Sequence, residues 1–263
     1  MAQELTIEER RELAREILSY QGFVSLAELV DNLKVSESTV RRDLEILEQQ
    51  GLVRRTHGGA VYIKDSATHR YAFDERQTTA APEKRAIARA AAALLTDGQT
   101  VLIDGGTTCY EVARQIAGRR LSVVTNSLPI ASVLSAEMAT EVTLLGGYVY
   151  PRTGVALGAM AEQQAELVHG SLVVLSCAGI AQDGTYNPNQ MMVDVERKMM
   201  AAADEVIFVV DHTKFGHRAV AKLCELDEID IIVTDSGLDP DAGAWLARLE
   251  ARVIIADTEL QEA

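Results

Sequence analysis

After Pro82 the sequence alternates regularly between two residue patterns. Short apolar runs are separated by helical patterns, and five of the runs end in Asp or Asn. The runs are TVLID to Asp104, SVVTN to Asn126, IFVVD to Asp211, DIIVTD to Asp235 and VIIAD to Asp257. The helical patterns lie near residues 83–95, 108–117, 128–136, 190–203 and 240–250. This alternation is typical of βαβ units on a mostly parallel sheet buried on both faces, so we expect an α/β fold.

In an open sheet of this kind, ligands bind in the crevice beyond the carboxyl ends of the strands. The most specific candidate there is VLIDGGTTCYEVARQI, in which Asp104, Gly105 and Gly106 lead into Thr107 and Thr108 at a helix start. The free N–H groups of a helix start and the two hydroxyls can hold a phosphate. The spacing fits neither a dinucleotide fingerprint nor a P-loop, because no Lys follows the glycines. A simple tight turn would explain the glycines but not the threonines.

Other polar residues close neighbouring strands and are weaker candidates when taken singly. If the sheet is wound as predicted, they converge on the same crevice. They are Thr125, Asn126 and Ser127 after the second run, Gly146 and Gly147 after EVTLL, and Lys214 in DHTKFG.

The first 64 residues follow a different pattern, with three short helical segments. Two of these segments begin with a capping box, formed by Thr6 with Glu9 and by Ser25 with Glu28. The third, SESTVRRDLEIL, has Ser36 as its expected N-cap.

In that third helix a buried stripe is expected at the i, i+4, i+7 positions Val40, Leu44 and Leu47. Next comes LVRRTHGGAVYI, two β-prone runs around a Gly-Gly pair that favours a tight hairpin. Three helices and a hairpin suit a winged helix-turn-helix, in which the third helix enters the major groove of DNA. We expect DNA contacts from Ser36, Ser38, Thr39, Arg41 and Arg42 on the helix, and from Arg54, Arg55, His57, Gly58 and Gly59 on the hairpin. The alternative for Arg41 and Arg42 is pairing with Glu37, Asp43 or Glu45 on a solvated helix.

Composition limits the kinds of partner. The chain of 263 residues has a net charge of −14, which argues against indiscriminate binding of nucleic acid over the whole surface. Residues 1–65 carry 9 basic and 12 acidic groups, so most of the negative charge lies further along the chain. No apolar run approaches the ~18 to 20 residues of a membrane span, and the start of the chain is too charged for a signal peptide.

The cysteines and histidines give no sign of a metal site. Cys109, Cys177 and Cys224 are far apart and lack the paired spacing of zinc ligands, and His212 and His217 flank Lys214 without further ligands nearby. We expect a cytoplasmic protein without a metal or other cofactor. Cys109 at a helix start could have a lowered thiol pKa, but a small buried filler explains it better.

The run S-x-S-T-V-R-R-D-L, followed by L-V-R-R-T-H-G-G-A, resembles the N-terminal signature of the DeoR family of bacterial sugar-metabolism regulators. The resemblance extends along the chain. It includes Arg76, Glu83 with Lys84, Asp-x-Gly-Thr-Thr, Thr-Asn-Ser, Gly-Gly, a Gly-Ile pair and Asp-x-x-Lys.

This resemblance implies a C-terminal domain similar to the sugar-phosphate isomerase fold that binds a phosphorylated sugar or polyol. By analogy Gly105, Gly106, Thr107 and Thr108 would cradle the phosphate, Asp104 would face sugar hydroxyls and Lys214 would supply positive charge. We expect a winged helix-turn-helix in residues 1–64, a linker in 65–81, and an effector and oligomerisation domain in 82–263. Since one DNA-binding module buries only ~600 to 1,000 Å² on DNA, a dimer or tetramer of a repressor on operator double-stranded DNA is expected.

The alternative is a sugar-phosphate isomerase-like enzyme with an appended DNA-binding module. Isomerases of this fold carry acids in a segment that here reads Ser176-Cys177-Ala178-Gly179-Ile180, without a carboxylate. Glu196 occupies a place that resembles the isomerase base, yet its partners are missing, so we expect no enzyme and treat Glu196 as an effector-side hydrogen-bonding residue or a helix-surface charge. A pure adaptor protein is disfavoured by the many polar groups at strand ends.

Overall fold

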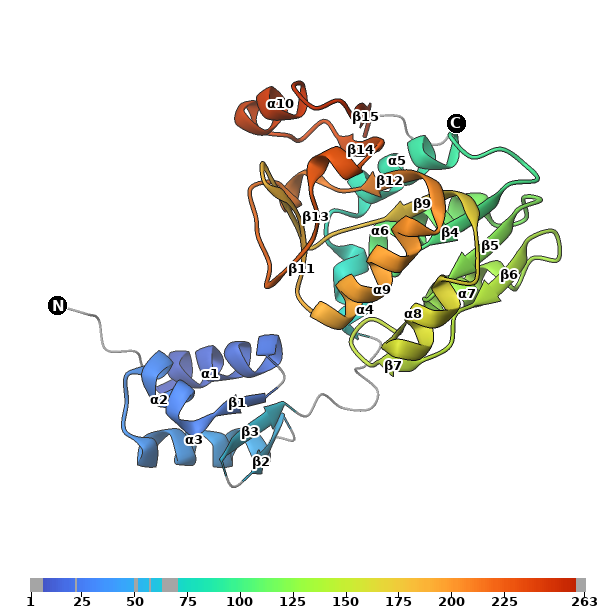
Figure 1. Cartoon of the computed structure of the whole chain (residues 1–263). Helices are drawn as coiled ribbons and strands as arrows, with labels where there is room; N and C mark the ends of the chain where they lie inside the picture. The colour runs from blue at the N-terminus through green and yellow to red at the C-terminus, as the bar shows by residue number, and fades with distance from the viewer. Residues whose placement is uncertain (1–6, 22, 50–51, 57, 63–70, 259–263) are drawn as a thin grey trace. The chain divides into compact units, whose positions relative to one another are not determined.

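The computed structural model describes residues 7–21, 23–49, 52–56, 58–62 and 71–258 (Figure 1). The chain divides into two compact units, Met1–Tyr71 and Ala72–Ala263. The expected linker over 65–81 needs correction in its second half, because Tyr71–Thr78 form a helix, α4. Weak periodicity hides this helix in the sequence, but its Phe73 ring packs edge-on against Tyr110 at 5.3 Å. Residues 65–70 lie outside the described part of the chain.

The N-terminal unit contains the three expected helices and the hairpin. In order they are α1 (Ile7–Gln21), β1 (Phe23–Ser25), α2 (Leu26–Leu33), α3 (Glu37–Gln49), β2 (Val53–Thr56) and β3 (Gly59–Tyr62). The predicted stripe of Val40, Leu44 and Leu47 is buried in the core of this unit. The capping box of Ser25 and Glu28 is confirmed, whereas Thr6 lies outside the described residues.

The hairpin pairs with a third, short strand that the sequence did not indicate. β3 lies between β2 and β1, and both neighbours pair with it antiparallel. Thr56 faces Gly59 across the hairpin, so Gly59 belongs to the strand rather than to the turn. A Cβ at Gly59 would lie 2.2 Å from the carbonyl oxygen of Val24 on β1, so the glycine is needed for this close backbone approach.

A buried carboxylate fastens α1 to α3. Asp43 is 2% exposed and accepts from Nε of Arg10 at 2.6 Å and from Nε of Arg11 at 2.9 Å. A buried carboxylate is stable only with such partners, so Arg10 and Arg11 hold the fold together rather than face a partner.

The second unit is built on a seven-stranded sheet with the order β15-β14-β12-β9-β4-β5-β6, in which every neighbouring pair is parallel. Its strands are β4 (Thr100–Ile103), β5 (Ser122–Thr125), β6 (Glu141–Leu144), β9 (Gly170–Leu175), β12 (Ala203–Val209), β14 (Ile231–Asp235) and β15 (Arg252–Ala256). The predicted mostly parallel α/β fold is therefore confirmed. The strand order reverses between β4 and β9, and such a switch point is where doubly wound sheets bind ligands.

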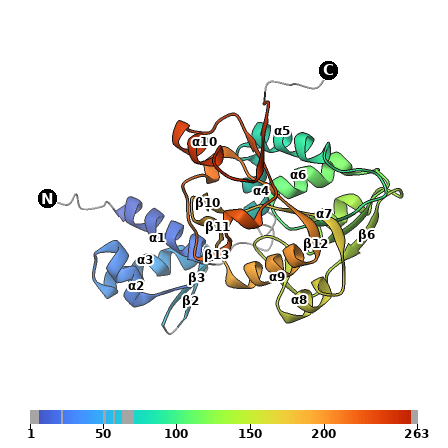
Figure 2. The ribbon, with the colours of Figure 1, turned by 45° about the horizontal axis from the view of Figure 1, so that its top comes forward.

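Helices cover both faces of this sheet, and each face has its own apolar core (Figures 1 and 2). One face is covered by α5 (Ala81–Ala92), α6 (Thr107–Ile116) and α7 (Leu128–Leu134). The other is covered by α8 (Ala159–Ala165), α9 (Gln190–Ala201) and α10 (Pro240–Leu246).

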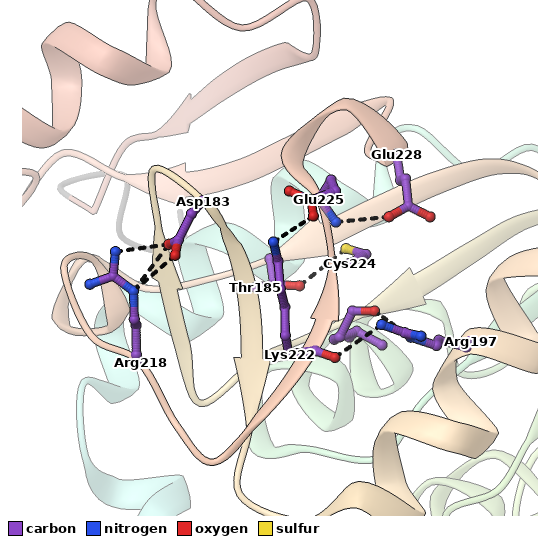
Figure 3. Close-up of polar contacts among 9 residues, drawn as sticks. Asp183, Thr185, Arg197, Arg218, Lys222, Cys224, Glu225 and Glu228 are labelled. Carbon is purple, nitrogen blue, oxygen red and sulfur yellow. Dashed lines mark hydrogen bonds and ion pairs between the residues drawn. The ribbon is translucent and has the colours of Figure 1, made fainter.

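Smaller elements complete the second face. They are a ribbon of β7 (Tyr148–Tyr150) and β8 (Val155–Leu157), a small antiparallel sheet of β10 (Gly179–Ala181), β11 (Gly184–Asn187) and β13 (Ala221–Cys224), and the 3₁₀ turns η1 (His212–Lys214) and η2 (Leu226–Glu228). Figure 3 shows how polar contacts hold the small sheet. Arg218 pairs with Asp183 at 2.9 Å, and Arg197 of α9 donates from Nε to the carbonyl oxygen of Leu223 at 2.7 Å. The Arg197 contact fixes β13 against α9, and the Arg218 pair holds the turn between β10 and β11.

The two neighbouring glycines of the hairpin give a matched test of this packing. We expect Gly59→Ala to destabilise the N-terminal unit by about 1–3 kcal/mol, because the new Cβ overlaps the backbone of β1. Gly58→Ala should stay within about 0.5 kcal/mol of wild type, because nothing lies within 4 Å of a Cβ there. Urea unfolding followed by circular dichroism measures both, and equal losses would contradict the close approach of β1.

Candidate functional site

The start of α3 presents three hydroxyl side chains. Ser36 Oγ lies 2.9 Å from both Ser38 Oγ and Thr39 Oγ1, and it accepts from the backbone N–H of Thr39 at 3.3 Å. Ser36 therefore caps α3, as predicted. Ser36 and Ser38 are exposed and Thr39 is half-buried, so the hydroxyl cluster lies at the surface.

The two adjacent arginines differ in their surroundings. Arg41 donates from Nε and Nη2 to Glu37 Oε1 at 2.9 and 2.7 Å, while Arg42 is exposed and has no ion-pair partner among the described residues. Asp43 pairs with α1 and not with either of them. An exposed pair of this kind contributes only about 0–1 kcal/mol, so it does not prevent Arg41 from turning to a phosphate or a base.

A groove of about 330 Å³ lies between α3 and the hairpin. It is lined by Leu26, Arg41, Leu44, Glu48, Arg55, Thr56 and Gly59. Arg55 donates from Nε to Glu48 Oε2 at 2.6 Å and from its backbone N–H to Glu48 Oε1 at 2.8 Å. The backbone bond, followed by the guanidinium, lowers the pKa of the Glu48 carboxyl. Of the other candidates, Gly58 is exposed at the turn, while His57 and the side chain of Arg54 lie outside the described residues.

In the second unit, a cavity of about 70 Å³ lies where α6 begins and where β9 and β12 end. It is lined by Arg76, Thr79, Lys84, Thr107, Thr108, Ser176, Cys177, Val209, Val210, Asp211 and Lys214. Three predicted residues, Thr107, Thr108 and Lys214, meet there. The two predicted glycines form the turn behind them: a Cβ on Gly105 would lie 2.0 Å from Val155 Cγ1, and one on Gly106 would lie 2.5 Å from Ser176 Oγ.

Lys84 and Arg76 are the main cavity residues to which the sequence assigned no role. Lys84 is 3% exposed, and its Nζ donates to the carbonyl oxygen of Thr79 at 2.6 Å and to that of Arg76. Burial lowers the pKa of Lys84 to about 8, and the charge of Asp211 opposes this shift. Asp211 is itself buried and accepts from the backbone N–H of Thr213 at 3.1 Å. The cavity thus places three cationic side chains around one buried carboxylate and two threonine hydroxyls.

A second polar network, which does not line the cavity, is buried at the carboxyl ends of β4 and β5. Asn126 donates from Nδ2 to Asp104 Oδ1 at 2.9 Å and accepts from the backbone N–H of Gly105 at 3.1 Å. Glu196 accepts from Asn187 Nδ2 at 2.8 Å on each of its carboxyl oxygens. Burial raises the pKa of Asp104 to about 6, and burial together with the Asp104 charge raises that of Glu196 well above its usual value.

Asp104 and Glu196 are buried acids that influence each other's pKa. Asp104 Oδ2 has no hydrogen-bond partner among the described residues, and the charge of Asp104 follows burial among the causes that raise the pKa of Glu196. Glu196 is 1% exposed and hydrogen-bonded to Asn187. This acid is a buried hydrogen-bonding residue and not a helix-surface charge.

Three more predicted residues lie away from the cavity lining and have local contacts. Thr125 Oγ1 accepts from the backbone N–H of Ser127 at 3.1 Å, and Ser127 Oγ accepts from that of Ile130 at 3.5 Å as the cap of α7. Gly147 has φ 154, and a Cβ there would lie 2.7 Å from the carbonyl oxygen of Leu157. Position at a strand end alone does not separate such residues from those that face the cavity.

The cysteines near the cavity are buried thiols. Cys109 lies in the first turn of α6 and Cys177 lines the cavity, and burial raises the pKa of both. Among the residues that the structure describes, no group of three or more His, Cys, Asp or Glu could hold a metal ion. Within the same residues, no helix is both long and apolar enough to cross a membrane.

A winged helix-turn-helix unit followed by a doubly wound unit with a cationic cavity defines a class: DNA-binding regulators with an attached sensor domain. The DeoR-like helix-turn-helix domain matches residues 10–66, and the DeoR C-terminal sensor domain matches residues 79–236. The chain belongs to the DeoR family of transcriptional regulators.

Individual relatives agree with this assignment. The chain is 34% identical over 239 residues to the uncharacterised HTH-type transcriptional regulator YulB of Bacillus subtilis. The aligned region covers 90% of this chain and 92% of that protein. It is 36% identical over 237 residues to the HTH-type transcriptional regulator GlpR of Haloferax volcanii, with 89% and 92% covered. Among solved structures, ribose 5-phosphate isomerase A of Neisseria gonorrhoeae matches 51% of this chain and 53% of its own at 13% identity, with a TM-score of 0.38.

Asp104 should make stability depend on pH in a defined direction. A carboxyl whose pKa is raised by folding from 3.8 to about 6 favours the folded state below pH 4, and this contribution is lost as the pH rises through 6. Asp104→Asn keeps an oxygen for the Asn126 amide and removes the charge. We expect the variant to be more stable at pH 7, by on the order of 1–3 kcal/mol, and no more stable at pH 4. Urea unfolding at the two pH values measures this, and parallel pH profiles would contradict the buried charge.

Proposed function

We propose that this protein is a repressor of carbohydrate-metabolism genes whose affinity for operator DNA is controlled by a phosphorylated sugar or polyol bound in the cavity of its second unit. The observation that carries the proposal is the meeting of Arg76, Lys84 and Lys214 with the hydroxyls of Thr107 and Thr108 in one cavity. Cations, hydroxyl donors and a helix start are the groups that proteins use to hold phosphate. They meet at a strand-order reversal, where doubly wound sheets bind ligands.

The sugar part of the ligand would extend from this cavity toward polar groups at the neighbouring strand ends. Asp104, which precedes the Gly-Gly turn, and its partner Asn126 are the candidates for hydrogen bonds to the sugar hydroxyls. The sequence-based expectation named the same residues. Thr125, Ser127, Gly147 and Glu196 would then support these groups rather than contact the phosphate.

Lys84 offers a route by which the ligand could act on the rest of the chain. An ammonium group has three N–H donors, and those of Lys84 already serve the carbonyl oxygens of Arg76 and Thr79 at the end of α4. The third is available to an anion in the cavity. We propose that a bound phosphate holds Lys84 in its charged form. The charged ammonium group then makes stronger hydrogen bonds to the carbonyl oxygens at the end of α4, the first helix after the DNA-binding unit. Two or more copies of the chain would act together, so that a change at α4 alters the spacing of their α3 helices on DNA.

A second candidate function, an isomerase-like enzyme, is favoured only by the buried pair of Asp104 and Glu196. A general base must reach its substrate directly or through one water, and Glu196, which resembles the isomerase base, does not line the cavity. Turnover of aldose or ketose phosphates that is lost in Glu196→Gln would support the enzyme.

Two double variants should separate ligand binding from DNA binding. Thr107→Ala with Thr108→Ala should abolish the rise in melting temperature that sugar phosphates produce, while operator binding persists, because only cavity hydroxyls are removed. Arg41→Ala with Arg42→Ala should weaken operator binding at fixed salt by at least about tenfold and leave the thermal shift intact. Thermal shift against a panel of sugar phosphates and fluorescence anisotropy on DNA measure the two properties. A threonine double variant that responds normally would remove the cavity from the proposal.

Lys84 should make anion binding depend on pH. Because its pKa is about 8 in the free protein, Lys84 loses its proton above pH 8 and the site loses a positive charge. Sulfate, a dianion throughout this range, should therefore bind about tenfold more weakly at pH 9 than at pH 7. Lys84→Arg should remove this dependence, since arginine stays charged. Sulfate titrations followed by calorimetry provide the measurement, and an unchanged slope in the arginine variant would exclude Lys84 as the titrating group.

A further inference from the structure

The arginines that border the groove of the N-terminal unit are each held by a carboxylate of the same unit. Arg41 pairs with Glu37 one turn earlier on α3, and Arg55 of β2 pairs with Glu48 near the end of α3. Arg41, Glu48 and Arg55 all line the groove. Most non-specific affinity for DNA comes from cations that neutralise phosphates, so pairing these two arginines with carboxylates reduces what the groove can offer a phosphate.

The contact of Glu48 with Arg55 is more than a loose surface pair. One carboxylate oxygen accepts from the backbone N–H of Arg55 at 2.8 Å, and the other accepts from its guanidinium at 2.6 Å. The backbone bond fixes the position of the carboxylate relative to β2, so the guanidinium meets an acid that is held in place. The Glu37 pair, in contrast, joins two exposed side chains on one helix.

We propose that Glu48, assisted by Glu37, is a specificity-determining residue that suppresses binding to random DNA by occupying the arginines of the groove. On random sequence, Arg55 gains a single phosphate and must share or leave its carboxylate. At a specific site, a guanine edge offers an arginine two hydrogen bonds in a fixed geometry, which offsets the loss of the internal pair. The carboxylates therefore weaken random binding more than specific binding. The ratio of the two affinities is what determines occupancy of an operator among a large excess of other sequences.

Glu48→Gln in the full chain tests this without knowledge of the operator. Glutamine keeps a carbonyl oxygen for the Arg55 N–H, so the backbone bond can persist while the charge is lost. The probe is a fluorescently labelled duplex of random sequence, titrated by anisotropy at several salt concentrations. We expect binding to tighten by roughly three- to tenfold at low salt, and the slope of log affinity against log salt to steepen by up to about 0.9, the value of one added phosphate contact.

The matched control is Glu12→Gln, which removes the same charge from the same unit by breaking the exposed Glu12–Arg15 pair on α1, away from the groove lining. It should change random-duplex affinity by less than about twofold. Equal tightening in the two variants would mean that only net charge matters, and would overturn the proposal. So would an unchanged affinity in Glu48→Gln with the fold intact by circular dichroism.

A double-mutant cycle with Arg55→Gln separates release of the arginine from simple repulsion. If Glu48 acts by occupying Arg55, the gain from Glu48→Gln should fall to less than about twofold when Arg55 is already replaced. A gain that persists in full in the Arg55→Gln background would overturn the assigned role of Glu48.

Discussion

The reversal of strand order between β4 and β9 is the constraint on which the second unit depends. From that point β5 and β6 extend the sheet on one side, and β12, β14 and β15 extend it on the other. The connections on the two sides therefore leave the strand ends in different directions, and space remains between them. The first turn of α6 fills part of this space with threonine hydroxyls, and the ends of β9 and β12 supply Ser176 and Asp211. A sheet with its strands in simple chain order would have no such opening.

The parts of the fold that could be predicted from sequence are those in which one residue pattern has one structural solution. A run such as TVLID must be a buried strand in a chain of this composition, and the N-cap and apolar stripe of α3 are local features with strong signals. The position of Thr107 and Thr108 at the start of a helix was predictable for the same reason, because a Gly-Gly turn fixes where the following helix begins. The general alternation did not distinguish Asn126, which holds Asp104, from Ser127, which caps α7.

The parts that could not be predicted depend on contacts between distant residues. Lys84 lies in an alanine-rich helix and reads as a surface charge, and it is buried because the end of α4 folds back over it. α4 in turn is stabilised by the contact of Phe73 with Tyr110, which the local sequence pattern does not predict. Asp43 sits among charged neighbours on α3, yet it pairs with arginines 32 and 33 residues earlier. Lys84 and Asp43 thus bond to distant residues and not to solvent. The periodicity of a single sequence does not reveal such partners.

The burial of the cysteines has a consequence for the signals that this regulator can receive. Oxidants and electrophiles react with exposed thiolates, whereas Cys109, Cys177 and Cys224 are all buried and have raised thiol pKa values. At neutral pH these sulfurs remain protonated and shielded. Burial therefore protects these three thiols from oxidation, whichever ligand the second unit binds.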